Sequence, residues 1–225
     1  MVSAVRAWVL GVVVMAMMLA ASAAHAREQV VLVMGDSLSA AYGLRPEQGW
    51  VALADAKSRR YDFRNASVSG ETTAGGRSRI DAELERTRPD IVIIELGAND
   101  GLRGLPLRQM GANLGWMIGR SRAAGARVLL VGLQLPPNFG TYAGEFQRSY
   151  VLISQRLRTG LVPHFLAPLG TERRWFQADN LHPVAAAQPL LADEMLRALD
   201  ALPPGRTCCA ALRGTIWLAS RHAHT

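Results

Sequence analysis

Histidine is the side chain best suited to moving a proton near neutral pH, and this chain of 225 residues has five of them. Two lie within the last four residues and one lies in an apolar N-terminal segment, so only His164 and His182 fall in the middle of the chain. His164 stands in a short apolar run typical of a strand, and we interpret it as a structural imidazole. His182 is therefore the candidate general base.

Asp179 precedes His182 by three residues, in a loop that Pro183 closes. This spacing lets the carboxylate reach Nδ1, which fixes the tautomer of the ring and leaves Nε2 free to accept a proton. A helix-capping aspartate beside an unrelated histidine would have the same spacing. The pair alone therefore leaves both interpretations open.

A base of this kind can activate a hydroxyl group, because a free serine is a poor nucleophile near neutral pH. Ser37 is the best-placed candidate, since it stands close to Gly35 at a predicted strand-to-helix turn. Acyl transfer also builds negative charge on the carbonyl oxygen, and preorganised donors must point at that oxygen. The candidate donors are the N–H of Ser37, the backbone at Gly70 and the side-chain amide of Asn99, although ordinary turn positions would also explain Gly70 and Asn99.

These residues follow apolar runs that are typical of parallel strands covered on both faces. Strands are predicted over residues 30–34, 63–68, 91–96, 128–133 and 161–165. Ser37, Gly70 and Asn99 each come shortly after one of the first three. Because open parallel sheets bind ligands beyond the carboxyl ends of their strands, we expect these residues to meet there.

Apolar residues with helical spacing lie between and after the strands, over residues 107–117, 146–157 and 191–202, and Pro189 suits the first turn of the last helix. Strands that alternate with helices predict βαβ units and an α/β fold in three layers, a sandwich of helices, sheet and helices. No internal repeat or low-complexity linker interrupts this pattern. Residues 27–205 are therefore predicted to form one domain.

The chain resembles the SGNH/GDSL hydrolase family in four blocks, which are Gly35-Asp36-Ser37-Leu38-Ser39, Gly70, Gly97-x-Asn99-Asp100 and Asp179-x-x-His182-Pro183. The blocks occur in the family's order, and the resemblance covers most of residues 30–202. Residues 35–44, 95–104 and 179–192 also resemble the periplasmic branch of multifunctional acyl-CoA thioesterases, arylesterases and lysophospholipases.

The resemblance implies a flavodoxin-like α/β/α sandwich with a five-stranded, mainly parallel sheet. It also implies a serine esterase that hydrolyses carboxylic ester or thioester bonds through an acyl-enzyme. Ser37 would be the nucleophile, with Asp179 and His182 completing the triad, and Ser37, Gly70 and Asn99 would form the oxyanion hole. This mechanism requires no metal ion and no cofactor.

The residues that would select a substrate are less distinctive. Leu102 and Leu105 follow the Asn99 block and are candidates for lining an acyl groove, with Trp175 on the other side. Simple packing of these side chains beneath the loops explains them equally well. The expected partner is a small-molecule ester or a lipid.

Both ends of the chain differ from the predicted domain. Residues 1–26 are predicted to be a secretory signal peptide, with Arg6 before an apolar stretch and Ala24-His25-Ala26 as a cleavage pattern. We therefore expect an exported protein, periplasmic or secreted, without a stable membrane anchor; an uncleaved anchor is the alternative. Residues 206–225, with adjacent cysteines at 208 and 209, are predicted to be a poorly ordered tail.

The formal net charge of +7, from 25 basic and 18 acidic residues, would suit a nucleic-acid partner. The basic residues are scattered along the chain, however, whereas a surface that follows phosphates needs them clustered on one face. We therefore expect no nucleic-acid partner, and we expect a monomer.

Three other function classes compete with the esterase interpretation. A carbohydrate deacetylase of the same superfamily is the nearest. A metallophosphoesterase would use Gly35-Asp36 and residues 97–100 as part of a metal site, but such sites need several histidines and only two are available. A non-catalytic flavodoxin-like binding module would leave the convergence of a serine, a histidine and an aspartate without a reason.

Overall fold

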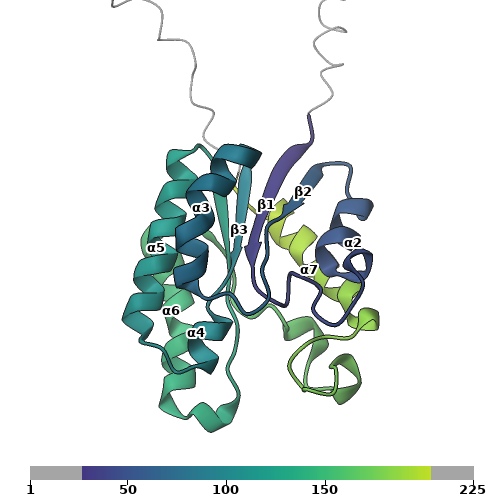
Figure 1. Cartoon of the computed structure of the whole chain (residues 1–225), viewed down its shortest axis with the longest axis vertical. Helices are drawn as coiled ribbons and strands as arrows, with labels where there is room; N and C mark the ends of the chain where they lie inside the picture. Colours follow the sequence, from purple (N-terminus) through teal and green to yellow (C-terminus); the bar gives the residue numbers. More distant parts are fainter. Residues whose placement is uncertain (1–26, 204–225) are drawn as a thin grey trace, which may run out of the picture.

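The computed structural model describes residues 27–203. The predicted signal peptide and the predicted tail, with both cysteines, lie outside these residues. The described chain has five strands and six α-helices, which alternate except where α4 and α5 follow each other (Figure 1). In order, they are β1 (Gln29–Gly35), α2 (Trp50–Lys57), β2 (Tyr61–Asn65), α3 (Thr73–Thr87), β3 (Ile91–Glu95), α4 (Ala98–Leu102), α5 (Leu107–Ala123), β4 (Arg127–Val131), α6 (Thr141–Leu157), β5 (Gly160–Val162) and α7 (Gln188–Asp200).

The strands form one sheet in the order β2-β1-β3-β4-β5, and every neighbouring pair is parallel. Helices α3, α5 and α6 cover one face, and α2 and α7 pack together on the other (Figure 1). The predicted three-layer α/β fold is confirmed. The sheet described here is wholly parallel, where a mainly parallel one was expected.

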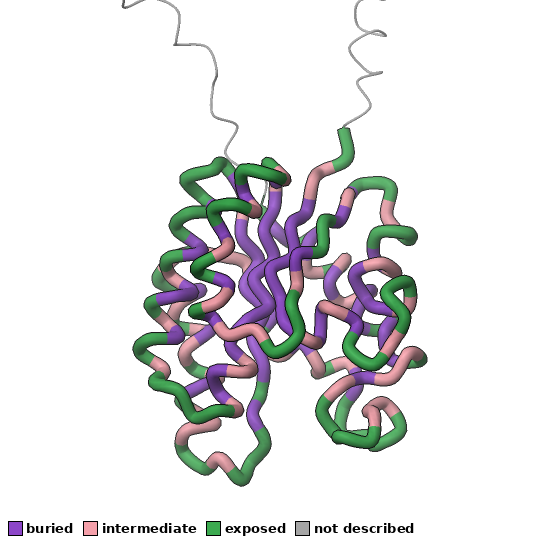
Figure 2. Tube along the Cα trace, viewed as in Figure 1, coloured by how far each residue is buried: buried purple, intermediate pink, exposed green. Residues whose placement is uncertain are grey.

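The core lies in the sheet and beneath its helices (Figure 2). Every residue of β3 is fully buried, as a strand covered on both faces requires. The helices reach the sheet through apolar faces, for example Met110, Leu114 and Met117 of α5, which are spaced by four and three residues. Among residues 27–203, no helix is both long and apolar enough to cross a bilayer.

Two predicted strands are shorter in the structure than in the sequence pattern. The second strand ends at Asn65, whose side-chain Oδ1 accepts from the N–H of Ser67 and so turns the chain. The fifth ends at Val162, because Pro163 has no N–H to continue the ladder. His164 therefore lies after β5 and not within a strand, where the sequence placed it.

The segment after β1 also differs from the expected strand-to-helix turn. Residues 37–43 form consecutive turns, and a regular helix begins only at Trp50. Ala41 and Gly43 have φ values of 56° and 72°, which are incompatible with a right-handed helix. Ser37 is thus presented by a turn rather than by the first turn of a helix.

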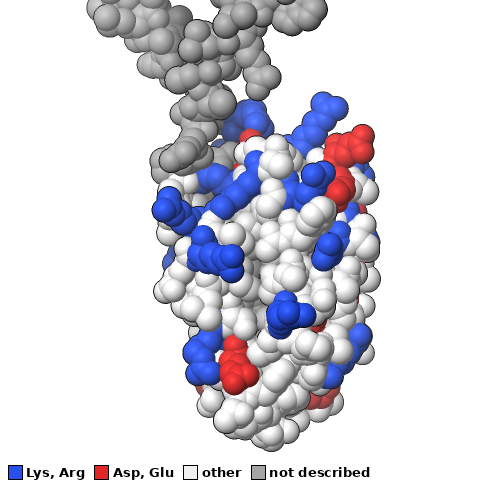
Figure 3. Space-filling model, turned by 90° about the vertical axis from the view of Figure 1, so that its left-hand side faces the viewer, with Lys and Arg blue, Asp and Glu red and all other residues white. Residues whose placement is uncertain are grey.

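The surface formed by α3, α5 and α6 carries more basic than acidic side chains (Figure 3). Several of these arginines are already engaged within the molecule. Arg120 pairs with Asp81, and both Arg77 and Arg120 lie against the indole ring of Trp116, at 4.9 and 6.0 Å from its centroid.

Candidate active site

The residues predicted for the triad and the oxyanion hole meet where the order of the strands reverses. The chain runs from β1 outward to β2 and then returns to β3 on the other side of β1, so the loops after β1 and β3 diverge. Ser37 follows β1, Gly70 follows β2 and Asn99 lies in the first turn of α4, directly after β3. The loop at residues 179–183, before α7, brings His182 to the same edge of the sheet.

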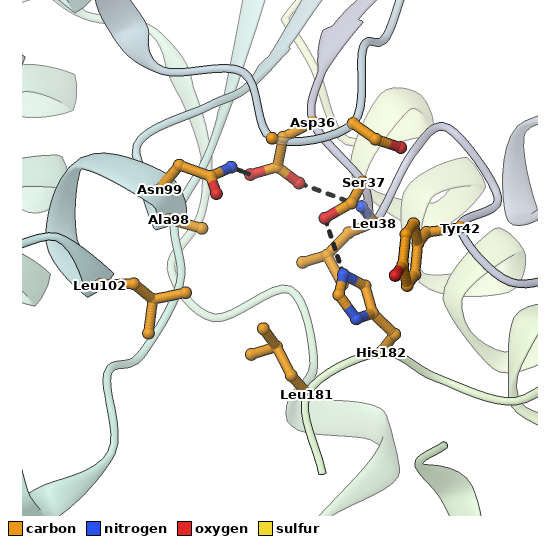
Figure 4. Close-up of a pocket in the computed structure, with 11 residues that line it drawn as sticks. Asp36, Ser37, Leu38, Tyr42, Ala98, Asn99, Leu102, Leu181 and His182 are labelled. Carbon is orange, nitrogen blue, oxygen red and sulfur yellow. Dashed lines mark hydrogen bonds between the residues drawn. The ribbon is translucent and has the colours of Figure 1, made fainter. Parts of the chain in front are cut away.

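Ser37, His182 and Asp179 form a continuous relay. Nε2 of His182 lies 2.8 Å from Oγ of Ser37 (Figure 4). Nδ1 of the same ring lies 2.7 Å from Oδ2 of Asp179. The contact with Ser37 joins residues 145 positions apart in the chain. A neutral imidazole with its proton on Nδ1 would donate to Asp179 and accept from the Ser37 hydroxyl, which is the arrangement needed for a general base.

Asp179 is held in its ionised form by its own loop. Partial desolvation acts to raise its pKa, but the backbone N–H and the ring of His182 and the N–H of Leu181 outweigh it and lower the pKa to about 2. Its Oδ1 accepts from the N–H groups of Leu181 and His182 at 2.9 and 3.0 Å. The carboxylate therefore stays charged at neutral pH and orients the imidazole. No helix begins at Asp179, since the next helical residues start at Ala185, so its backbone contacts hold the loop and do not cap a helix.

The imidazole of His182 also lies against an aromatic ring that no sequence motif had indicated. The rings of Tyr42 and His182 have centroids 4.4 Å apart and are tilted by 37°. Tyr42 comes from the turns after Ser37 and stands half exposed at the pocket. No periodicity predicted it either, because its place depends on the path of residues 37–43.

The three predicted oxyanion donors line one pocket but differ in their hydrogen bonds. Within residues 27–203, the N–H groups of Ser37 and Gly70 have no acceptor. Gly70 has a φ of +78°, a conformation that favours glycine. The amide nitrogen of Asn99 instead donates to Oδ2 of Asp36 at 3.1 Å and to the carbonyl oxygen of Glu71 at 2.9 Å. Asn99 is thus at the pocket with both amide hydrogens already engaged.

Two further aspartates of the matched blocks hold these loops together. Asp36 is buried and accepts from the N–H of Leu38 and from Asn99; burial raises its pKa to about 6, against the opposing effects of Leu38, His182 and Asn99. Asp100 accepts from both the N–H and the hydroxyl of Thr73, at 2.8 and 2.5 Å. Asp100 therefore ties α4 to the start of α3.

The pocket at this site has a volume of about 230 Å³ and is mainly apolar around the relay. Of the three predicted groove residues, Leu102 lines it, while Leu105 and Trp175 do not. The carbonyl of Leu105 accepts from the Tyr142 hydroxyl, and Trp175 packs against the core with Arg174 over its ring. The lining residues are Asp36, Ser37, Leu38, Tyr42, Ser69, Gly70, Ala98, Asn99, Leu102, Leu181 and His182.

Neither a cluster of metal-ligating side chains nor a second histidine accompanies this pocket. Within the described residues, no three His, Cys, Asp or Glu side chains are grouped as a metal ion would require. His164 lies outside the pocket lining, and partial burial lowers its pKa. His164 is therefore not brought to the relay.

The chain matches the family model described as "GDSL-like Lipase/Acylhydrolase family" over residues 33–189. It is 47% identical over 183 residues to "Esterase TesA" of Pseudomonas aeruginosa, covering 79% of this chain and 91% of that protein. It is 36% identical over 179 residues to "Thioesterase 1/protease 1/lysophospholipase L1" of Escherichia coli K12, covering 79% of this chain and 86% of that protein.

A solved structure shares the same architecture. The crystal structure of the psychrotrophic esterase EstA from Pseudoalteromonas sp., inhibited by monoethylphosphonate, superposes with a TM-score of 0.73 at 42% identity. The match covers 77% of this chain and 97% of that one. The described fold is therefore shared along nearly the whole length of a known esterase.

Proposed function

Because this chain belongs to the GDSL-like lipase/acylhydrolase family and is an esterase, we propose that it hydrolyses lipid esters and aryl or short-chain esters through an acyl intermediate on Ser37. The observation that carries the proposal is the relay from Ser37 through His182 to Asp179, which opens on a pocket. The serine, the base and the orienting carboxylate are the three groups that such a reaction needs.

The first half of the reaction transfers the acyl group to the enzyme. His182 takes the Ser37 proton on Nε2 while Oγ attacks the substrate carbonyl, and Asp179 stabilises the imidazolium that forms. The N–H groups of Ser37 and Gly70 are available to the resulting oxyanion. The imidazolium then gives its proton to the departing alcohol or thiol, which leaves the acyl group on Ser37.

The second half releases the acid. Water replaces the leaving group in the pocket, and His182 removes a proton from it as it attacks the acyl-Ser37 carbonyl. The tetrahedral species collapses, the acid departs, and the proton returns to the Ser37 oxygen. No step calls for a metal ion or a cofactor.

The nature of the pocket supports an apolar acyl group. Leu38 approaches it from the turn after β1, Leu102 from the end of α4 and Leu181 from the loop before α7, with Ala98 beside Asn99 (Figure 4). Burying a chain of methylene groups against these side chains is favourable by about 0.8 kcal/mol for each buried methylene. Esters whose acyl group contains several methylenes should therefore bind better than acetylated sugars, whose acetyl group contains none.

The proposed setting of the enzyme follows from the predicted signal peptide at residues 1–26. An exported enzyme meets lipids and small esters far more often than acyl-CoA, so the natural substrates belong to the first two groups. A panel of p-nitrophenyl esters, lysophospholipids, acyl-CoA and acetylated saccharides ranks these classes, and a preference for acetylated saccharides would contradict the proposal.

Replacing Ser37 by alanine tests the nucleophile. We expect Ser37→Ala to abolish hydrolysis of p-nitrophenyl butyrate while circular dichroism and the thermal transition stay unchanged, because the hydroxyl is part-buried beside the pocket and not in the core. A fluorophosphonate should label the wild-type protein and not the variant.

The control is Ser78→Ala, which removes an exposed hydroxyl on α3 whose only hydrogen bond among the described residues is to the Gly75 carbonyl. This variant should keep full turnover and full labelling. Appreciable turnover by Ser37→Ala would show that another group attacks the ester.

A further inference from the structure

A carboxyl group that the proposed reaction does not use lies directly beneath the nucleophile. Glu95 is the last residue of β3, beside Gly35 of β1 in the sheet, and is fully buried. Its Oε2 accepts from the N–H of Asp36 at 3.3 Å and from the hydroxyl of Ser39 at 2.7 Å. The indole N–H of Trp50 donates in turn to Ser39 Oγ at 3.2 Å.

Through these contacts Glu95 binds the chain both before and after Ser37. Asp36 precedes Ser37 and Ser39 follows it by two residues, so one carboxyl oxygen binds the turn on either side of the nucleophile. Ser39 is anchored to α2 as well, through Trp50. The position of Ser37 relative to His182 therefore depends on a contact between β3 and the turn after β1.

The geometry around Glu95 fits a neutral carboxylic acid. Both donors converge on Oε2, as they would on a carbonyl oxygen, while Oε1 is buried and has no partner within residues 27–203. An ionised carboxylate with one bare oxygen in this position would be costly. Burial raises the pKa of Glu95 well above its usual range, and the neighbouring Asp36 carboxylate raises it further.

Of the other ionisable groups near this site, Asp36 also raises the pKa of Glu95, and the rest lie farther from its carboxyl group. Asp36 faces Glu95 from the turn after β1, and Asp100 lies on α4. Tyr150 approaches from α6, donating its hydroxyl to the Leu96 carbonyl, and burial raises its pKa well above its usual range. The cationic form of His182 would act on Asp36 rather than on Glu95.

We propose that Glu95 is a positioning residue of this esterase, a buried neutral carboxylic acid whose carbonyl oxygen fixes the turn that carries Ser37. The proposal rests on the proposed role of Ser37 as nucleophile. Glu95 is not among the residues that line the pocket, so it acts only through Asp36 and Ser39. Its loss should therefore lower turnover without weakening substrate binding.

Two substitutions separate the acceptor from the charge. Glu95→Gln keeps a carbonyl acceptor in a neutral side chain of the same shape, and we expect its kcat to stay within about threefold of wild type. Glu95→Leu removes the acceptor, and we expect kcat for p-nitrophenyl butyrate to fall about 100-fold with KM within about twofold. Rates are expressed per active serine, titrated with a fluorophosphonate, so that unfolded protein does not contribute.

Infrared spectroscopy can detect directly whether the Glu95 carboxyl group is protonated. At about pH 8, Asp36, with a pKa of about 6, is ionised, so a carbonyl stretch from a protonated carboxylic acid should come from Glu95. The band should be present in wild type and absent in Glu95→Gln. The matched control is Glu85→Gln on the exposed side of α3, which should leave both the band and kcat unchanged.

The results decide the proposal even if Glu95→Leu fails to fold. It is overturned if Glu95→Gln loses turnover as severely as Glu95→Leu, or if wild type shows no protonated-carboxyl band. Turnover by Ser37→Ala would instead overturn the proposed nucleophile, and would leave the band of Glu95 as it was.

Discussion

Individual side chains at the site act in pairs, each fixing the other's state. Asp179 is ionised because its own loop donates to it, and it thereby orients the ring of His182. Asp36 is buried, yet it accepts from Asn99 and so holds that amide at the pocket. The Asn99 amide already donates to Asp36 and to the Glu71 carbonyl, so it would have to give up one of these hydrogen bonds in order to donate to an oxyanion.

Replacing Asn99 by alanine tests the third oxyanion donor. We expect Asn99→Ala to lower kcat for p-nitrophenyl butyrate by about 10²–10³ with little change in KM, because the lost donor acts on charge that exists only in the transition state. Steady-state kinetics measure both constants. A kcat within about threefold of wild type would leave the Ser37 and Gly70 N–H groups as the sufficient oxyanion site.

The junctions between strands and helices position these side chains. Between β3 and α4, Gly97 has a φ of +120°, and a Cβ there would collide with the hydroxyl of Tyr150 from α6. That hydroxyl donates to the Leu96 carbonyl at 3.0 Å. The sharp exit from β3 that delivers Asn99 therefore requires a residue without a side chain.

A substitution at Gly97 should be costly for this reason. We expect Gly97→Ala to lower the free energy of unfolding by about 2–4 kcal/mol, from backbone strain and the collision together. Denaturant unfolding measures the change. In a Tyr150→Phe background the same substitution should cost less, because the nearest colliding atom is gone.

Gly119 of α5 supplies the control. It lies on the exposed side of the helix, and a Cβ at this position would meet no other described atom within 4 Å, apart from its own helix backbone and chain neighbours. Gly119→Ala should therefore raise stability by about 0.5–1 kcal/mol. Equal effects of the two alanine substitutions would contradict the account of Gly97.

The site is assembled at one edge of the sheet from segments spread along the described domain. The relay, the two free N–H groups and the pocket all come from residues 36–182, and α7 packs with α2 on one face of the sheet. Of the chain's 25 basic residues, 21 fall in residues 27–205 together with all 18 acidic ones. The excess charge of the full chain thus owes more to its two ends than to the domain that carries the site.

The proposed domain boundary can be tested by truncation. We expect residues 27–203 to fold and to match the kcat/KM of residues 27–225 within about twofold, because every residue assigned to the reaction lies inside the shorter segment. Both proteins are compared on p-nitrophenyl butyrate and by thermal unfolding. A large loss of activity with an unchanged thermal transition would assign the last residues a part in substrate binding.

The residue types and their local spacing already contained the strand pattern, the three-layer fold and the pairing of Asp179 with His182. These follow from interactions between near neighbours in the chain: apolar runs fit a doubly covered strand, and a carboxylate three residues away can reach an imidazole. Contacts over long sequence separations were decided by the packing of the sheet and its loops. They include the approach of His182 to Ser37 across 145 positions, the contact of the Tyr42 ring with His182, the exclusion of Leu105 and Trp175 from the pocket, and the place of Glu95 beside the turn that carries Ser37. None of these has a signal in the spacing of near neighbours, because each depends on which loops the parallel sheet brings to the same edge. Only the pairing of Ser37 with His182 was expected, from the resemblance to the family's ordered blocks.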